Sequence, residues 1–162
     1  MFWFDGAVSR AFTKEDDAGE DLPEMPVPEG PNYVTPRGLE LLKAAGRELV
    51  ARKKLATPDT VKPIDRDLRY LESRINSAIV VPRGAGPEIR FGARVTLEEE
   101  GGQKTTFQIV GDDEARTGGE FLSWSAPLAL AMLGARQGDT VAWEGPDAVV
   151  RYKVLSVDFG AS

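Results

Sequence analysis

Three aspartates close to one turn could bind a divalent cation. Asp59, Asp65 and Asp67 lie within the stretch LATPDTVKPIDRD, residues 55–67, which also holds two prolines. Carboxylate oxygens are the ligands that Mg²⁺ prefers, and a second metal ion can stabilise the attacking and leaving oxygens of a phosphoryl transfer. Two hypotheses follow: the stretch carries a metal ion to another molecule, or it only connects two helices.

The amino-acid composition excludes several other kinds of chemistry. The chain of 162 residues contains no histidine and no cysteine. Disulfide bonds are therefore excluded, as are the usual zinc ligands and the commonest general base. A catalytic centre would have to use carboxylates, Lys, Tyr, Ser or Thr. The absence of cysteine, and of any apolar run of about 20 residues, predicts a cytoplasmic protein that does not enter a membrane.

Charge is distributed unevenly along the chain, whose net charge is −6. Residues 1–34 carry a net charge of −6, residues 35–75 carry +4 and the remainder carries −4. An acidic chain with one basic segment does not have the charge expected of a general nucleic-acid coat. The basic segment could still contact a phosphate backbone or an acidic protein surface.

The first of three predicted parts is an acidic, proline-rich arm at residues 1–32. Residues 14–32 hold four prolines and seven acidic residues, and few apolar side chains. Such a segment cannot bury enough apolar surface to offset the entropy of ordering, so we expect it to be extended or disordered. The MFWF stretch at residues 1–4 either packs on a neighbouring element or precedes the natural start of the chain.

An antiparallel helical hairpin is predicted at residues 33–81. Thr35 is a favourable N-cap and Pro36 suits the first position of the first helix, which we expect to end at Pro58. The second helix is expected to begin near Ile64. Apolar residues recur at helical spacing along one seam: Leu39, Leu42, Leu49, Ile64, Leu68, Leu71, Ile75 and Ala78. Three basic residues are placed on the solvated faces of the second helix: Arg66, Arg69 and Arg74.

The third part, residues 87–162, is predicted to be a β-sheet domain with one short helix. Alternating apolar residues indicate strands near residues 89–100, 104–111, 138–145 and 149–159, with a further short strand near residue 122. The stretch APLALAMLGA predicts a compact helix, with Pro127 near its start and Gly134 past its end. The fold class of the whole chain is therefore predicted to be α+β.

Six stretches in this order resemble the Gre family of bacterial transcription elongation factors. They are YVTPRGLELL, IDRDLRYLESRI, RFGARVTL, FQIVGDDEA, SAPLALAMLG and GDTV, and the second is closest to the GreB branch. The resemblance implies an FKBP-like C-terminal domain and bacterial RNA polymerase as the partner, with the hairpin as a coiled coil that enters the polymerase secondary channel. We expect a monomer whose contact with nucleic acid, in the elongation complex, is at most indirect.

The resemblance also implies a polymerase-docking surface around residues 123–133. The docking residues that we carry over are Asp112, Asp113, Glu114, Ser123, Ser125, Pro127 and Leu128. Ala126 stands where the family usually has a serine, with Ser125 one position earlier. The acidic run at residues 112–114 lacks the spacing of a calcium loop, so we interpret it as a solvated turn.

The hairpin departs from the family pattern at its tip. Gre factors carry Asp-x-x-Glu followed by Asn-Ala there, and residues 55–67 contain neither. The hairpin is also shorter, as in the Rnk-type relatives. The residues that we assign to the tip are Lys53, Lys54, Asp59 and Lys62.

We therefore predict a regulator of RNA polymerase that does not stimulate transcript cleavage. This hypothesis requires no cofactor, no metal ion and no catalytic residue, so the protein would not be an enzyme. Two alternatives stay open: a true cleavage factor that uses Asp59 or nearby acids, and an FKBP-like peptidyl-prolyl isomerase, which would need an aromatic-lined pocket. The sequence leaves open whether such a regulator activates, inhibits or competes.

Overall fold

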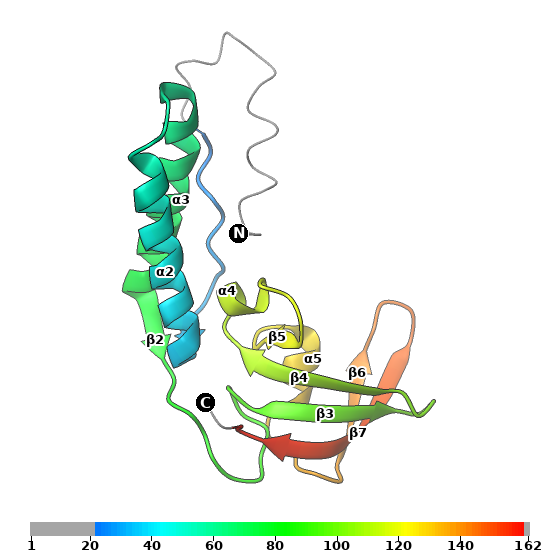
Figure 1. Cartoon of the computed structure of the whole chain (residues 1–162). Coiled ribbons are helices and arrows are strands. Elements are labelled where there is room, and N and C mark those ends of the chain that lie inside the picture. Colours follow the sequence, from blue (N-terminus) through cyan, green and yellow to red (C-terminus); the bar gives the residue numbers. More distant parts are fainter. Residues whose placement is uncertain (1–21, 161–162) are drawn as a thin grey trace. The chain divides into compact units, whose positions relative to one another are not determined.

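The computed structural model describes residues 22–160, which form two compact units (Figure 1). The helical unit contains the described residues up to Asn32 together with Leu39–Ile79. The C-terminal unit contains Tyr33–Gly38 and the described residues from Val80 onward. The predicted arm at residues 1–21, including its MFWF stretch, lies outside the described residues. None of the helices within residues 22–160 is both long and apolar enough to cross a membrane.

Two antiparallel helices, α2 (Pro36–Lys53) and α3 (Pro58–Ser77), make up most of the helical unit. The short strands β1 (Asn32–Val34) and β2 (Ala78–Val80) precede and follow the pair and form a two-stranded sheet. The buried apolar side chains confirm much of the predicted seam: Leu42, Ala45, Leu49, Ile64 and Leu71. Neither β1 nor β2 was predicted.

The predicted boundary between the two helices is wrong. α2 ends at Lys53, and Pro58 is the first residue of α3 instead of the residue that ends α2. Thr57 is the N-cap: its backbone N–H donates a 2.9 Å hydrogen bond to Oγ1 of Thr60, and the two hydroxyls lie 3.1 Å apart. A proline favours this position because the first N–H groups of a helix have no intrahelical acceptor.

Arg74 was predicted on a solvated face, but it is only 2% exposed. Its Nη2 donates a 2.6 Å hydrogen bond to Oδ1 of Asn32, and Nδ2 of Asn32 donates a 2.8 Å bond to the backbone oxygen of Arg74. Arg66 also departs from the prediction, since its side chain is 12% exposed and forms an ion pair with Asp67. A guanidinium can be buried where fixed acceptors match its donors, which helical periodicity alone does not reveal.

A five-stranded sheet forms the body of the C-terminal unit, with strand order β5-β4-β3-β7-β6. The strands are β3 (Arg94–Glu99), β4 (Lys104–Val110), β5 (Phe121–Ser123), β6 (Thr140–Glu144) and β7 (Val149–Asp158). Neighbours are antiparallel except for β4 and β5, which are parallel. The helix α5 (Pro127–Met132) confirms the predicted compact helix, and a further short helix, α4 (Asp112–Ala115), follows β4.

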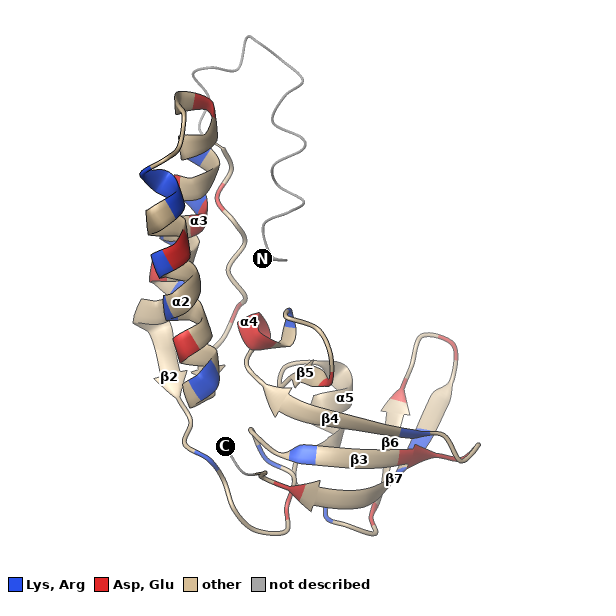
Figure 2. Ribbon diagram, in the orientation of Figure 1, with Lys and Arg blue, Asp and Glu red and all other residues tan. Residues whose placement is uncertain are grey.

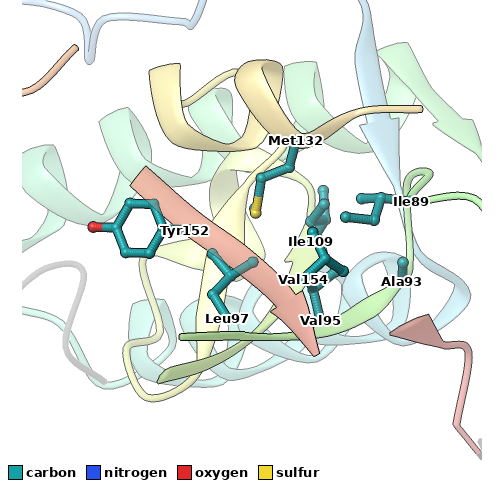
Figure 3. Close-up of a cluster of buried hydrophobic side chains, with 8 residues drawn as sticks. All are labelled: Ile89, Ala93, Val95, Leu97, Ile109, Met132, Tyr152 and Val154. Carbon is teal, nitrogen blue, oxygen red and sulfur yellow. The ribbon is translucent and has the colours of Figure 1, made fainter. Parts of the chain in front are cut away.

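One apolar core holds this unit together. Eight buried side chains meet between the sheet and α5 (Figure 3): Ile89, Ala93, Val95, Leu97, Ile109, Met132, Tyr152 and Val154. Met132 is fully buried and points from α5 toward the strands. The core therefore fixes the position of α5 and of the segment that leads into it.

Candidate functional site

The segment between β5 and α5 brings three of the predicted docking residues together. Oδ1 of Asp112 accepts hydrogen bonds from the hydroxyls of Ser123, at 2.5 Å, and Ser125, at 2.7 Å. The two serine hydroxyls lie 2.9 Å apart. We call Asp112, Ser123 and Ser125 the acid–serine network. It ties the start of α4 to the end of β5, so the loop before α5 has a defined conformation.

The short helix α5 presents a partly apolar surface to solvent. Pro127, at its first position, is exposed, and Leu128 is half-buried against the core. Two leucines that were not predicted as site residues are exposed: Leu130 is 52% exposed and Leu133 is 40% exposed. Their spacing from Met132 and Ala129, both fully buried, could have shown which side of the helix each residue takes.

Asp113 and Glu114 do not lie in a solvated turn, and that interpretation is wrong. The two residues are 3% and 4% exposed and belong to α4. Oε2 of Glu114 accepts a 2.5 Å hydrogen bond from the hydroxyl of Thr35, and its Oε1 lies 3.3 Å from Nη1 of Arg37. A buried carboxylate needs such partners, and here they are Thr35, just before α2, and Arg37, in its first turn.

Aromatic contacts join Tyr33 and Arg37 to the predicted docking residues' neighbours, Trp124 and Phe121. The ring of Tyr33 meets Trp124 edge-on, with centroids 5.1 Å apart, and lies 6.2 Å from the ring of Phe91. The guanidinium of Arg37 lies 5.1 Å above the ring of Phe121. Trp124 and Phe121 are therefore held by packing, in part against residues that lie about 90 positions earlier in the chain.

The three aspartates of the opening stretch do not converge on one point. Oδ1 of Asp65 forms a 2.6 Å ion pair with Nζ of Lys53, whereas Asp67 is buried beside Arg66, 2.9 Å away. Burial raises the pKa of Asp67, and the hydrogen bond from Arg66 opposes that shift. Asp59 is the acidic residue in the first turn of α3, where its negative charge interacts favourably with the helix dipole.

The four residues assigned to the hairpin tip all lie at the turn and are exposed: Lys53, Lys54, Asp59 and Lys62. Figure 2 shows basic residues gathered where α2 ends. Within residues 22–160, no three His, Cys, Asp or Glu side chains are grouped so that they could hold a metal ion. Three of these four exposed residues are therefore basic, and Asp59 is the one acidic residue among them.

Comparison with known proteins gives consistent relatives. Residues 84–159 match the family described as transcription elongation factor GreA/GreB, C-terminal part. The chain is 31% identical over 153 residues to transcription elongation factor GreB of Neisseria meningitidis serogroup B, covering 79% of this chain and 94% of that protein. It is 35% identical over 100 residues to transcription elongation factor GreA of Verminephrobacter eiseniae, covering 59% of this chain and 63% of that protein.

Two solved structures that align with this chain carry related names. GreA factor homolog 1 of Thermus thermophilus is 20% identical, with a TM-score of 0.40 over 80% of this chain and 99% of that chain. A GreA/GreB factor from Nitrosomonas europaea is 23% identical, with a TM-score of 0.40 over 78% of this chain and 98% of that chain. Membership of a family rests on the sequence matches.

Proposed function

Because this chain belongs to the GreA/GreB family of transcription elongation factors, we propose that it binds bacterial RNA polymerase at the secondary channel and regulates elongation without stimulating transcript cleavage. The observation that carries this proposal is the composition of the hairpin turn. Lys53 is bound to Asp65, and Asp59 is the only acidic residue between Lys54 and Ile64.

A basic turn does not favour delivery of a second cation. Lys54 and Lys62 flank Asp59 in the sequence, and like charges repel a metal ion that a single carboxylate would have to hold. Mg²⁺ requires several oxygen ligands at about 2.1 Å. One exposed carboxylate among lysines supplies at most one of them. The same lysines would suit a channel lined with acidic groups.

The length of the hairpin supports the same conclusion. α2 has 18 residues and α3 has 20, which correspond to about 27 and 30 Å. The match to the meningococcal GreB extends over 153 residues but covers 79% of this chain, about 128 of 162 residues. About 25 positions of that relative therefore have no counterpart here. We propose that these positions fall in the hairpin, where a loss of about 12 residues from each arm would shorten it by roughly 18 Å.

The surface that we propose for polymerase contact is the acid–serine network together with the exposed side of α5. Leu130 and Leu133 offer apolar contacts, and the network holds the preceding loop in place. Apolar side chains on a rigid element, next to polar groups, are typical of an interface whose energy comes from a few residues.

Binding to polymerase is the direct test of this proposal. The full chain, carrying a fluorophore on one introduced cysteine, is titrated with bacterial core RNA polymerase, and an unlabelled GreB factor is then added. We expect saturable binding that GreB reverses, since both would occupy the same channel entrance. No binding, or binding that persists while GreB is bound, would refute the proposal.

A further inference from the structure

An acidic segment already lies on the basic hairpin. Oε1 of Glu24 accepts two hydrogen bonds from Arg69, at 3.0 Å from Nε and 2.6 Å from Nη2. The segment that precedes β1 runs beside α3 and carries acidic residues (Figure 2). The two residues of the pair are 45 positions apart, so the contact is tertiary.

Two contacts define the direction in which this segment runs. Asn32 bonds to Arg74 near the end of α3, whereas Glu24 bonds to Arg69, more than one helical turn closer to the hairpin turn. Following the chain backward from Asn32 to Glu24 therefore leads toward the hairpin turn.

Charge complementarity is strongest beyond that point. Residues 15–21 read EDDAGED and contain five carboxylates. The α3 helix rises about 10 Å from Arg69 to Lys62, a distance that three or four extended residues before Glu24 can span. The basic residues around the turn are Arg52, Lys53, Lys54, Lys62 and Arg66. Lys53 and Arg66 already have acidic partners, whereas Lys54 has no ion pair within residues 22–160.

We propose that the acidic run at residues 15–21 binds the basic side chains around the hairpin turn, chiefly Arg52 and Lys54. The run itself lies outside the described residues; its neighbour Glu24 shows the mode of contact. The bound run covers the surface that an acidic partner would use. Competition between the run and RNA polymerase rests on the proposed function, but the intramolecular contact does not.

The Glu24–Arg69 pair shows how such contacts respond to conditions. The hydrogen bond from Arg69 holds the pKa of Glu24 below its usual value. The pair therefore stabilises the docked segment above the ordinary pKa of a glutamate, and the contribution is lost as the pH falls. Exposed ion pairs are screened by salt, so the docking of residues 15–21 must weaken at high ionic strength.

A second surface of the hairpin is apolar, so a segment bound there would respond differently to salt. An open apolar groove runs between α2 and α3, lined by Gly46, Val50, Leu68, Leu71 and Ile75. Aromatic residues from the start of the chain could bind there by burial of apolar area. Such a contact would survive salt, unlike the docking of the acidic run.

The absence of cysteine allows a label at one chosen position. A nitroxide on Ala18→Cys, in the middle of the run, broadens backbone amide signals that lie near it in the full-length, isotope-labelled protein. We expect broadening at residues 52–62 in about 0.05 M NaCl, and its loss in about 1 M NaCl, where the screening length is about 3 Å. Broadening that persists in high salt, or none at these residues, would overturn the proposal.

Two charge-matched variants make the test specific. Asp17→Asn, Glu20→Gln and Asp21→Asn together should at least halve the broadening at low salt. Glu100→Gln, Glu144→Gln and Asp147→Asn, which raise the net charge equally in the C-terminal unit, should leave it unchanged. Equal loss in both variants would show a general charge effect and would contradict site-specific docking.

The same variants separate this inference from the proposed function. In the polymerase titration at low salt, the arm variant should bind about three- to tenfold more tightly than the parent, because a competing segment has been weakened. Failure of every variant to bind polymerase would refute the proposed function and leave the broadening result intact. Normal binding together with absent broadening would refute the docking alone.

Discussion

The hydroxyl of Thr35 donates a 2.5 Å hydrogen bond to Oε2 of Glu114, a residue 79 positions further along the chain. The same hydroxyl accepts a 2.8 Å hydrogen bond from the backbone N–H of Gly38. Thr35 therefore caps the start of α2 and satisfies a buried carboxylate of α4 with one group. Both ends of this contact belong to the C-terminal unit, so its stability depends on residues before α2.

The two glycines of α2 should respond oppositely to alanine. A Cβ at Gly38 would lie 2.7 Å from Oε2 of Glu114, which Thr35 holds in place, whereas a Cβ at Gly46 would meet nothing within 4 Å. Gly46→Ala should raise the free energy of unfolding by about 0.5–1 kcal/mol through helix propensity. Gly38→Ala should lower it. Urea unfolding followed by circular dichroism checks both, and stabilisation by Gly38→Ala would contradict the packing described here.

Asn32→Ala should destabilise the hairpin by about 1.5–3 kcal/mol, because the mutation removes an acceptor of a buried guanidinium. Asn76→Ala, an exposed change on α3, the helix that carries Arg74, serves as the control and should stay within about 0.5 kcal/mol. Amide hydrogen exchange in α3 reports the difference locally. Similar protection in the two variants would show that the Asn32–Arg74 contact contributes little.

Asp67 should make the protein less stable as the pH rises through the acid range. Burial raises its pKa in the folded state, so the folded state keeps a proton that the unfolded state loses first. Relative to Asp67→Asn, the parent's free energy of unfolding should fall as the pH rises past the ordinary pKa of an aspartate.

The pKa of Glu88 is shifted in the opposite direction to that of Asp67, so its effect on stability should have the opposite pH dependence. Hydrogen bonds from Arg136 and Arg90 lower its pKa, so its contribution is present above the ordinary pKa and is lost as the pH falls. Relative to Glu88→Gln, the parent's stability should therefore rise over the same range. The same slope for both carboxylates would contradict this account.

Leu130→Asp should weaken binding to RNA polymerase about tenfold, equivalent to about 1.4 kcal/mol, without unfolding the C-terminal unit. Leu130 is 52% exposed on α5, so its loss leaves the core unchanged. Val149→Asp is the matched control, since Val149 is 58% exposed on β7 in the same unit. Equal weakening by both changes would place the contact elsewhere.

Local sequence patterns predicted the helices and strands, whose formation depends on residues close together in the sequence. The helical spacing of Leu42, Leu49, Ile64 and Leu71 identified the seam of the hairpin, and alternation identified the strands of the large sheet. The boundary at Pro58 was missed because a proline is compatible both with the end of one helix and with the first position of the next. The Thr57–Thr60 pair, three residues apart, was the signal that could have decided it.

Long-range partners could not be predicted in this way. Arg74 and Glu114 were placed in solvent because their charges suggest exposure, yet their partners lie 42 and 79 positions away. Nothing in the local sequence of either residue indicates Asn32 or Thr35. At the site, Asp112, Ser123 and Ser125 were named through the resemblance to the family, but their hydrogen bonds to one another were not predicted, and the exposure of Leu130 depended on how Met132 packs.

The central claim is that the hairpin turn delivers no metal ion to the polymerase, and transcript cleavage measures this directly. Backtracked elongation complexes are incubated with Mg²⁺ and the purified full chain, alone or with a cleavage-active GreB factor. We predict no cleavage above the polymerase's own rate, slower cleavage by GreB as the protein is added in excess, and no change in either result for Asp59→Ala. Stimulated cleavage that Asp59→Ala abolishes would contradict the account, because it would make the turn a metal-binding tip.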